Sequence, residues 1–337
     1  MEPQSHLVSI DHQRIKTISK IVAGFSFNDA FLKRPFLTQV TDPLQKAHML
    51  FFAVGICHQT YALADASQNL YGWDYLEDGF LRMAQSGSFL LEPSEVATKN
   101  NLQVQQELRK FFSPGGNPVN CTLDRLDERA KLYADMAKNL CNKFKGNFLE
   151  VIRVANNHVV NNTEGFYALL SYFDAYSDPL FKKSSFLIKL LGDAGYIKLV
   201  DPENLVPVMD YHMQRVLLRT GCIKILSQQL EHALKNRIQT QDEPQIRTKC
   251  IEAMKLIAQA SGKDILRMND VFYMIGRSCC LDNPLCISGK CDKNPCSLTR
   301  SLTLEKHDSC VLKPACAATT NPAYAEYWHP TTQTHFY

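Results

Sequence analysis

Asp210 is the residue of this chain whose type and position indicate chemistry most directly. It follows Pro207 and opens a run of helix-forming residues, so the sequence predicts that it caps the N-terminus of a helix. A carboxylate in that position accepts backbone N–H bonds and stays ionised at neutral pH. Near a bound sugar it would stabilise a developing oxocarbenium ion or activate a water molecule, as carboxylates do in glycoside hydrolysis.

Two lysines precede this carboxylate on a predicted basic helix through residues 178–189, which ends at a turn containing Gly192 and Gly195. Lys182 and Lys183 would supply a positive or nucleophilic group. The alternative interpretation is structural: an ordinary helix cap followed by solvated lysines.

Cysteines form the second chemical signal, because seven of the twelve lie between Cys279 and Cys316. Thiolates at short, turn-separated spacings are what a tetrahedral zinc site or a [4Fe–4S] cluster requires. Such a metal would be structural, and the spacing does not decide iron from zinc. The sequence indicates no organic cofactor, and the alternative is a loop of unligated thiols. The predicted ligands are Cys280, Cys286, Cys291, Cys296, Cys310 and Cys316, with His307 as a further candidate.

The elements that position these residues are predicted to be helical. An amphipathic pattern runs from Asp124 to about Phe144, a further helix from about Gln214 to Lys235, and a third places Ile246, Cys250, Met254 and Ile257 on one face. Nothing before Gly276 alternates at period two. The fold class is therefore all-α. We expect three parts, 1–120, 121–276 and a cysteine-rich loop and tail at 277–337, with residues 1–276 forming one continuous domain.

Composition limits the function classes. The 337 residues are 45% apolar and 21% charged, with a net charge of +3 and a pI near 8.2. This mild basicity falls short of a dedicated nucleic-acid-binding domain. There is no apolar run of about 18 residues and no signal-peptide pattern at the N-terminus. We therefore expect a cytoplasmic protein with no membrane partner.

A series of segments, in order along most of the chain, resembles the queuosine salvage protein family, which comprises queuosine-5′-phosphate N-glycosylases. Each segment is a weak motif by itself, but their order and spacing are specific. The resembling segments are 70–75 (an aromatic Gly-Trp motif), 127–132 and 142–149, 180–183, 209–212, 243–247, 269–273 and the closing residues 329–337.

The resemblance implies a helical fold related to helix-hairpin-helix DNA glycosylases. It also implies that Asp210 is the carboxylate at the glycosidic bond and Lys182 a nearby basic group. The predicted substrate-binding residues are then the aromatic Trp73, Phe148 and Tyr211 and the polar His212, Gln245 and Arg247. Aromatic side chains would stack on a purine-like ring, and polar ones would bind its edge or a phosphate. Trp73 and Phe148 are alternatively core residues, and Arg247 a surface helix residue.

Three departures from the family pattern matter. Gln245 stands where the family has an acidic residue, His212 where it has an arginine, and the cysteine loop has no family counterpart. Several helix-hairpin-helix DNA glycosylases carry a C-terminal iron–sulfur loop, and residues 208–216 resemble their segment containing the catalytic aspartate. Their glycine-rich hairpin, which grips DNA phosphates, is missing from this chain.

Three functions follow. The first is a small-molecule N-glycosidase that hydrolyses the C1′–N bond of a 7-deazaguanine-type nucleoside or its 5′-phosphate; the family pattern and weak charge favour it. The second is a DNA glycosylase that excises a flipped base with Asp210, with or without Lys182; the cysteine loop and the basic stretches 138–145 and 182–189 favour it. The third is a non-catalytic binding protein.

Overall fold

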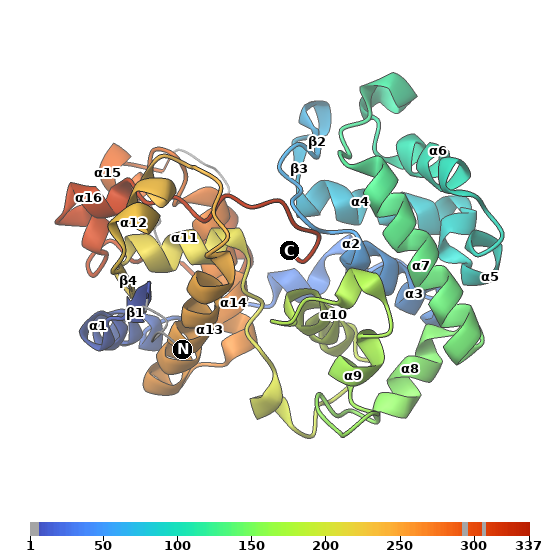
Figure 1. The fold of residues 1–337 in the computed structure, drawn as a ribbon, viewed down its shortest axis with the longest axis horizontal. Helices are drawn as coiled ribbons and strands as arrows, with labels where there is room; N and C mark the ends of the chain where they lie inside the picture. The colour runs from blue at the N-terminus through green and yellow to red at the C-terminus, as the bar shows by residue number, and fades with distance from the viewer. Residues whose placement is uncertain (1–6, 292–295, 305–307) are drawn as a thin grey trace. The chain divides into compact units, whose positions relative to one another are not determined.

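The computed structural model describes residues 7–291, 296–304 and 308–337, and its helices dominate (Figure 1). Helix accounts for 58% of the described residues and strand for 4%, which confirms the all-α prediction. The four strands of the described residues are two or three residues long and form two small antiparallel pairs. The chain divides into two compact units, Met1–Phe31 with Pro207–Gln333, and Leu32–Val206 with Thr334–Tyr337.

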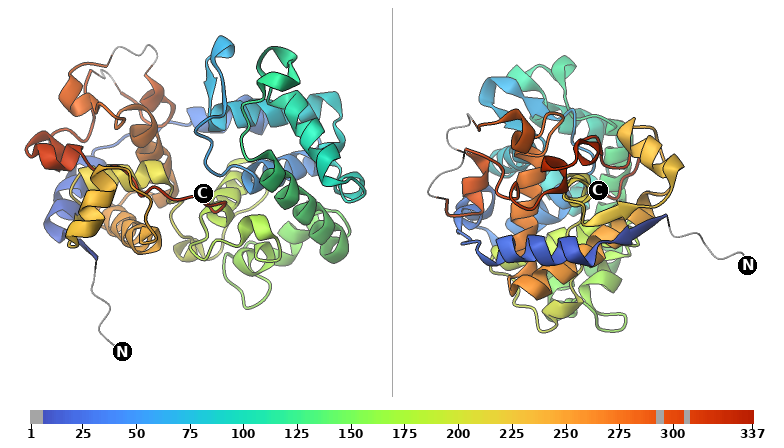
Figure 2. Two further views of the ribbon diagram at one scale, coloured as in Figure 1. Left: turned by 45° about the horizontal axis from the view of Figure 1, so that its top comes forward. Right: turned by 90° about the vertical axis from the view of Figure 1, so that its left-hand side faces the viewer.

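The first unit is built around helix α11 (Tyr211–Arg219), which packs against α14 (Ile265–Ser278) and α13 (Glu243–Ser261). The predicted apolar face of α13 is confirmed, since Ile246, Cys250, Met254 and Ile257 are all fully buried. Helix α1 (His12–Ala23) lies along α13 (Figure 2). Strand β1 (Val8–Ile10) pairs with β4 (Ile223–Ile225), which ties the N-terminal segment to the second half of the chain. The unit also contains α12 (Gln228–Lys235), α15 (Leu285–Ser288) and α16 (Pro322–Ala325).

The second unit surrounds the apolar helix α3 (Pro43–Gly55), which contacts α4 (Trp73–Ser86), α7 (Leu126–Phe144), α8 (Phe148–Ala155) and α10 (Lys182–Asp193). Its core is aromatic: Phe51 stacks on Phe148 and Tyr176, and Phe52 stacks on Tyr133. Shorter helices complete it: α2 (Pro35–Thr38), α5 (Pro93–Val96), α6 (Asn101–Phe111) and α9 (Phe166–Leu170). A small hairpin, β2 (Ala64–Asp65) with β3 (Leu70–Tyr71), precedes α4.

Two sequence expectations differ from the structure. The helix predicted from about Gln214 to Lys235 is wrong: α11 ends at Arg219, and strand β4 separates it from α12. Gly221 makes this break with a φ of +78°, a conformation that favours glycine. The two compact units also do not coincide with the parts 1–120, 121–276 and 277–337, because residues 1–31 group with residues far along the chain.

Candidate functional site

Asp210 lies at the N-terminus of α11, as predicted. Its backbone is extended, and its Oδ1 accepts a hydrogen bond from Met213 N at 2.9 Å. Asp210 is 8% exposed, so this cap is buried. The N-terminal end of a helix carries a partial positive charge, which favours a carboxylate there. The sequence rule that placed Asp210 on the cap is therefore confirmed; its catalytic role stays a prediction.

Around Asp210, two histidines surround the ring of Tyr211, with centroids 4.2 Å from His212 and 5.0 Å from His329. Arg215 links them, because its Nη1 lies 2.8 Å from His329 Nδ1 and its Nη2 lies 3.2 Å from His212 Nδ1. A guanidinium group only donates hydrogen bonds, so both Nδ1 atoms accept and the ring proton of each neutral histidine is on Nε2. Burial, together with the charge of Arg215, lowers the pKa of His329 to about 2. His329 is thus a neutral, oriented imidazole.

A buried ion pair lies next to α11. One of its members, Glu243, was not predicted as a site residue from the sequence. Arg247 Nε lies 3.0 Å from Glu243 Oε1, and Gln214 Nε2 donates to the same carboxylate at 3.2 Å. Arg247 is 1% and Glu243 5% exposed, so the alternative of a surface arginine is wrong. The signal for Glu243 was present, because residues four apart lie on one helix face.

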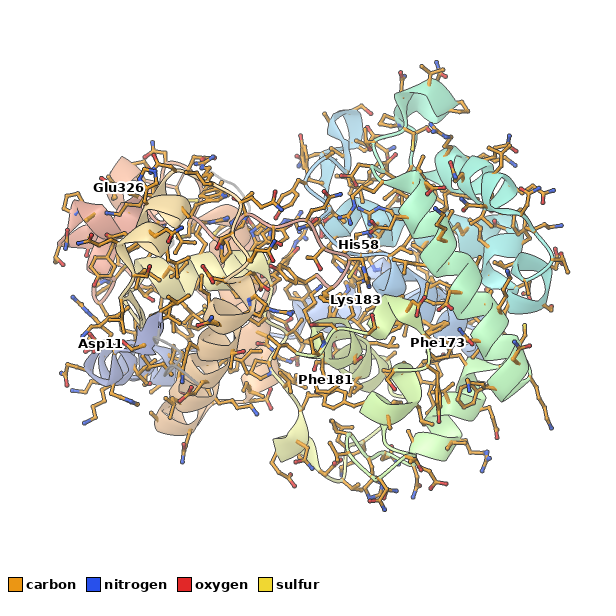
Figure 3. All side chains as sticks on the ribbon, in the orientation of Figure 1. Asp11, His58, Phe173, Phe181, Lys183 and Glu326 are labelled. Carbon is orange, nitrogen blue, oxygen red and sulfur yellow. The ribbon has the colours of Figure 1, made fainter. Side chains whose placement is uncertain are left out.

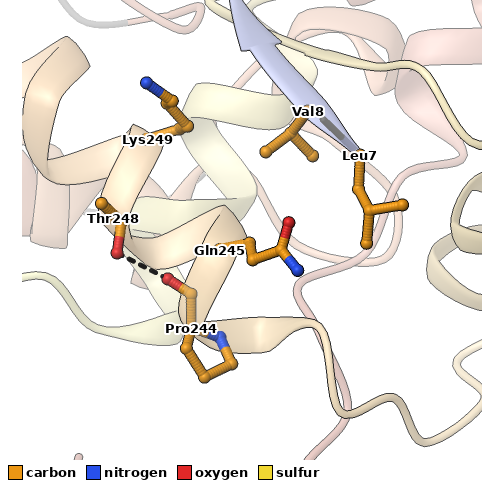
Figure 4. A pocket seen from close by; sticks show the side chains of 6 residues that line it. All are labelled: Leu7, Val8, Pro244, Gln245, Thr248 and Lys249. Atoms are coloured by element: carbon orange, nitrogen blue, oxygen red, sulfur yellow. Dashed lines mark hydrogen bonds between the residues drawn. The ribbon is translucent and has the colours of Figure 1, made fainter. Parts of the chain in front are cut away.

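Gln245 points away from this pair. It is exposed and lines a surface pocket of about 280 Å³ with Leu7, Val8 and Pro244 (Figure 4). Two residues of α13 that were predicted to bind the same substrate therefore face different surroundings: Arg247 the interior, and Gln245 a largely apolar surface pocket beside β1.

In the second unit, the two predicted lysines begin α10 and are both buried. Lys182 is 7% exposed, and its Nζ lies 3.5 Å from Cys57 Sγ and 5.2 Å from the ring centre of Phe186. Lys183 is fully buried, and its Nζ donates to Gly55 O at 2.5 Å. The alternative interpretation of solvated lysines is therefore wrong.

Lys183 is the first of several titratable side chains that lie next to one another (Figure 3). Its Nζ lies 3.4 Å from His58 Nδ1, and His58 Nε2 faces Glu128 Oε1 at 3.1 Å. Burial, reinforced by the nearby charges of Lys182 and Arg129, lowers the pKa of Lys183 to about 7. Burial and the charge of Lys183 also lower the pKa of His58 well below its ordinary value. This series of contacts was not predicted, because His58 and Lys183 are far apart in the sequence.

The two aromatic residues predicted in this unit have different surroundings. Trp73 is partly exposed, its Nε1 donates to Glu77 Oε1 at 2.7 Å, and its ring packs on Phe186 with centroids 4.8 Å apart. Phe186 is partly exposed too, and the buried Lys182 lies over its ring, so Trp73, Phe186 and Lys182 form one cluster of two partly exposed rings and a buried ammonium group. Phe148 is fully buried against Phe51, as its structural alternative expects, and this packing does not support a base-stacking role for it.

In the described part of the cysteine-rich segment, helix is limited to short elements, and its cysteines form no disulfide bonds there. Across the described residues, no group of three or more His, Cys, Asp or Glu side chains is arranged to hold a metal ion. His307 lies outside those residues. The metal site therefore stays a prediction at this point.

The fold and these residues define an all-α protein with a buried, helix-capping carboxylate and a buried lysine pair. The chain belongs to the queuosine salvage protein family, whose model matches residues 51–275. The match includes Asp210, Lys182 and Trp73 and ends before the clustered cysteines. It confirms the family resemblance and supports a role in queuosine salvage. No curated protein matches the chain significantly. The relation to helix-hairpin-helix glycosylases stays a prediction.

In the ranges that the structure describes, no helix combines the length and apolar character needed to cross a membrane.

Proposed function

We propose that this protein is an N-glycosidase that hydrolyses the C1′–N bond of a queuosine-type, 7-deazaguanine nucleoside or its 5′-phosphate and releases the free base. The single observation that carries the proposal is the buried carboxylate of Asp210 at the N-terminus of α11, in a chain of the queuosine salvage family. The family indicates the substrate class, and the carboxylate fits the charge that develops on the sugar.

The chemistry follows from that charge. As the C1′–N bond breaks, its electron pair leaves with the base, and the sugar becomes an oxocarbenium ion. A carboxylate beside C1′ stabilises this cation, or accepts a proton from the water that attacks C1′. Oδ1 of Asp210 is held by Met213 N, so the carboxylate is oriented before substrate binds. The departing base takes up one proton, and the sugar gains a hydroxyl group.

The cluster of Trp73, Phe186 and Lys182 in the second unit supports the binding part of the proposal. Partly exposed aromatic rings provide a face on which a deazapurine can stack, and a neighbouring ammonium group favours an anionic phosphate or a leaving base. Within the second unit, we propose Trp73 and Phe186 as stacking residues for a base and Lys182 as their positively charged neighbour. Tyr211, His212, Gln245 and Arg247 remain predicted substrate contacts, and Gln245 is the least supported because it lines a separate surface pocket.

The test is chromatographic detection of free queuine from queuosine and from queuosine 5′-monophosphate with purified protein. Asp210→Asn is the informative variant, because asparagine caps helices as well as aspartate and removes only the charge. We expect its rate to fall by about 10²–10⁴-fold, the usual contribution of a positioned acid or base. Asp264→Asn, which makes the same change at the cap of α14, is the matched control and should keep the wild-type rate.

The proposal fails if wild-type protein releases no base from either nucleoside, or if Asp210→Asn retains the wild-type rate. Duplex and single-stranded DNA with natural and modified bases are included in the same assay. Base release from DNA by an enzyme that leaves both nucleosides intact would replace the proposal with the DNA glycosylase function. A cycle of Asp210→Asn, Lys182→Met and the double variant measures the energetic coupling of the two residues in the reaction.

A further inference from the structure

A small cavity inside the first unit is lined by five cysteines. It has a volume of about 10 Å³, and Cys279, Cys280, Cys286, Cys310 and Cys316 line it together with apolar neighbours such as Leu312. Four of these five form two pairs of equal spacing, Cys280 with Cys286 and Cys310 with Cys316, each with a proline two residues before the second cysteine. The fold thus brings two copies of one short motif to the same cavity.

The sulfur atoms of the two pairs interact across the cavity. The thiols of Cys286 and Cys316, one from each pair, hydrogen-bond to each other. The fifth cysteine, Cys279, caps the C-terminus of α14. Cys291 and Cys296 hydrogen-bond to each other and are not among the residues that line the cavity.

Charge at the cavity wall is the second observation. Arg219 is 2% exposed, and its Nη1 lies 3.6 Å from Cys280 Sγ. The same Nη1 donates to the carbonyl oxygens of Cys280 and Leu281, Nε donates to that of Tyr327, and no carboxylate of the described residues pairs with Arg219. A buried cation without a counter-charge is costly, so an anionic group beside Cys280 would stabilise this arrangement.

We propose that Cys280, Cys286, Cys310 and Cys316 bind one divalent soft metal ion, of the zinc class, as four thiolates. Binding transfers no electrons: the thiols release their protons, and the four-thiolate complex keeps a net charge of −2, which Arg219 partly balances. The cavity is small, about 10 Å³, and the proposal is therefore for a single ion and not for the larger [4Fe–4S] cluster. Since the thiols do not yet converge on one point, their Sγ atoms rotate about Cα–Cβ to reach the ion.

The role of this ion is structural. It would hold Cys280 and Cys316 in place against α11. Arg219 of α11 contacts both residues, because its guanidinium lies beside Cys280 Sγ and its carbonyl oxygen accepts a hydrogen bond from Cys316 Sγ at 3.4 Å. Thiolates occupy all four positions of a tetrahedral ion and leave none open for a substrate. The proposal therefore does not depend on the glycosidase activity, and the failure of either leaves the other standing.

The test is metal analysis of full-length protein purified without a metal-chelating tag, with zinc, iron and acid-labile sulfide quantified per chain. We expect about one zinc per chain, and a fall of at least tenfold in Cys286→Ser and in Cys310→Ser. Cys291→Ser and Cys296→Ser are the matched controls from the same segment and should keep the metal. Cobalt loaded in place of zinc should give the charge-transfer absorption of thiolate ligands, and this absorption should weaken in the Cys286 and Cys310 variants.

Alkylation followed by mass spectrometry tests wild-type protein directly, in case a serine variant does not fold. A strong chelator should increase labelling of the four proposed ligands and leave that of Cys291 and Cys296 unchanged. Wild-type protein without bound metal overturns the proposal, as does equal metal loss from the control variants. Iron with stoichiometric sulfide overturns the single-ion assignment. A disulfide between Cys286 and Cys316 in freshly purified protein overturns the metal site in favour of a redox pair.

Discussion

Lys183 gives the sharpest test of the physical picture, because it is a fully buried lysine whose partners are uncharged. Its Nζ contacts Gly55 O and His58 Nδ1, and burial lowers its pKa from the ordinary value of 10.5 to about 7. At about 1.4 kcal/mol per pKa unit, burying the charged form costs about 5 kcal/mol. Lys183→Met removes this cost together with the hydrogen bonds, which contribute about 1.5–3 kcal/mol. Below pH 7 the variant should therefore be more stable than wild type by about 2–3 kcal/mol.

The difference in stability between wild type and Lys183→Met should depend on pH, and the direction of this dependence follows from the lowered pKa of Lys183. Between the folded pKa of about 7 and the unfolded value of 10.5, the unfolded chain binds more protons than the native one, so wild-type stability rises with pH. This contribution is complete above pH 10.5 and is lost as the pH falls through 7. Lys183→Met lacks it. The advantage of the variant should therefore shrink by about 3 kcal/mol between about pH 6 and pH 9, and its sign should change near the upper end.

Urea unfolding of both proteins at closely spaced pH values measures this difference, with hydrogen exchange of α3 and α10 amides to confirm that the second unit is the one reporting. Lys189→Met is the matched control, because Lys189 lies on the same helix but pairs with Asp193 at 2.7 Å. We expect that control to be destabilised over the same range. A stability difference between wild type and Lys183→Met that does not vary with pH would refute the reasoning.

Three further predictions concern other parts of the site. Arg247→Met should destabilise the protein by about 3–5 kcal/mol in urea unfolding, because it leaves the buried Glu243 carboxylate uncompensated, and adding Glu243→Gln should restore part of that loss. His329→Gln should flatten the loss of stability as the pH falls from 6.5 toward 4, because the pKa of His329 is lowered to about 2 and only the unfolded histidine takes up a proton there. Trp73→Leu should raise KM for the nucleotide by about 5–100-fold with little change in kcat, since stacking on a base contributes about 1–3 kcal/mol; an unchanged KM would remove Trp73 from the binding surface.

Local rules explain which parts of the site were predictable. The cap at Asp210, the amphipathic α7 and the buried face of α13 each depend on residues a few positions apart, so their patterns are visible in the sequence. The break at Gly221 was missed because the helix formers on both sides continue the same periodicity. A glycine is needed there because a Cβ would lie 2.9 Å from Ala317 Cβ, in a residue almost one hundred positions away.

The burial of Lys182 and Lys183 could not be predicted from the sequence, because it also depends on residues that are distant along the chain. A basic pair at the start of a helix is typical of a solvated surface, and the residues that bury this pair, 55–58, come from the end of α3. Glu243 differs from this case, because its spacing to Arg247 already indicated a pair on one helix face.

In each unit some buried cations donate to carbonyl oxygens at or just beyond the C-terminal end of a helix, alongside ion pairs such as Arg247 with Glu243 and Arg129 with Asp124. In the second unit Lys183 donates to Gly55 O and Arg129 to Ile56 O, at the end of α3. In the first unit Arg215 donates to Gly276 O and Cys280 O, at the end of α14. The last carbonyl groups of a helix lack intrahelical donors and carry partial negative charge, so a cation there is stabilised without a carboxylate.

Backbone carbonyl partners of this kind cannot be recognised from the sequence. Because the partners are backbone atoms, any residue type can supply them, and neither charge pairing nor motif spacing in the sequence indicates them. Of the described residues, no carboxylate forms an ion pair with Arg215 or with Lys183, so Arg215 in the first unit, and Lys183 in the second unit below pH 7, each contribute positive charge. A positive interior of this kind favours an anionic ligand such as a nucleoside 5′-phosphate over an uncharged nucleoside. The preference for queuosine 5′-monophosphate should therefore weaken as ionic strength rises, while turnover of the uncharged nucleoside should be nearly independent of salt.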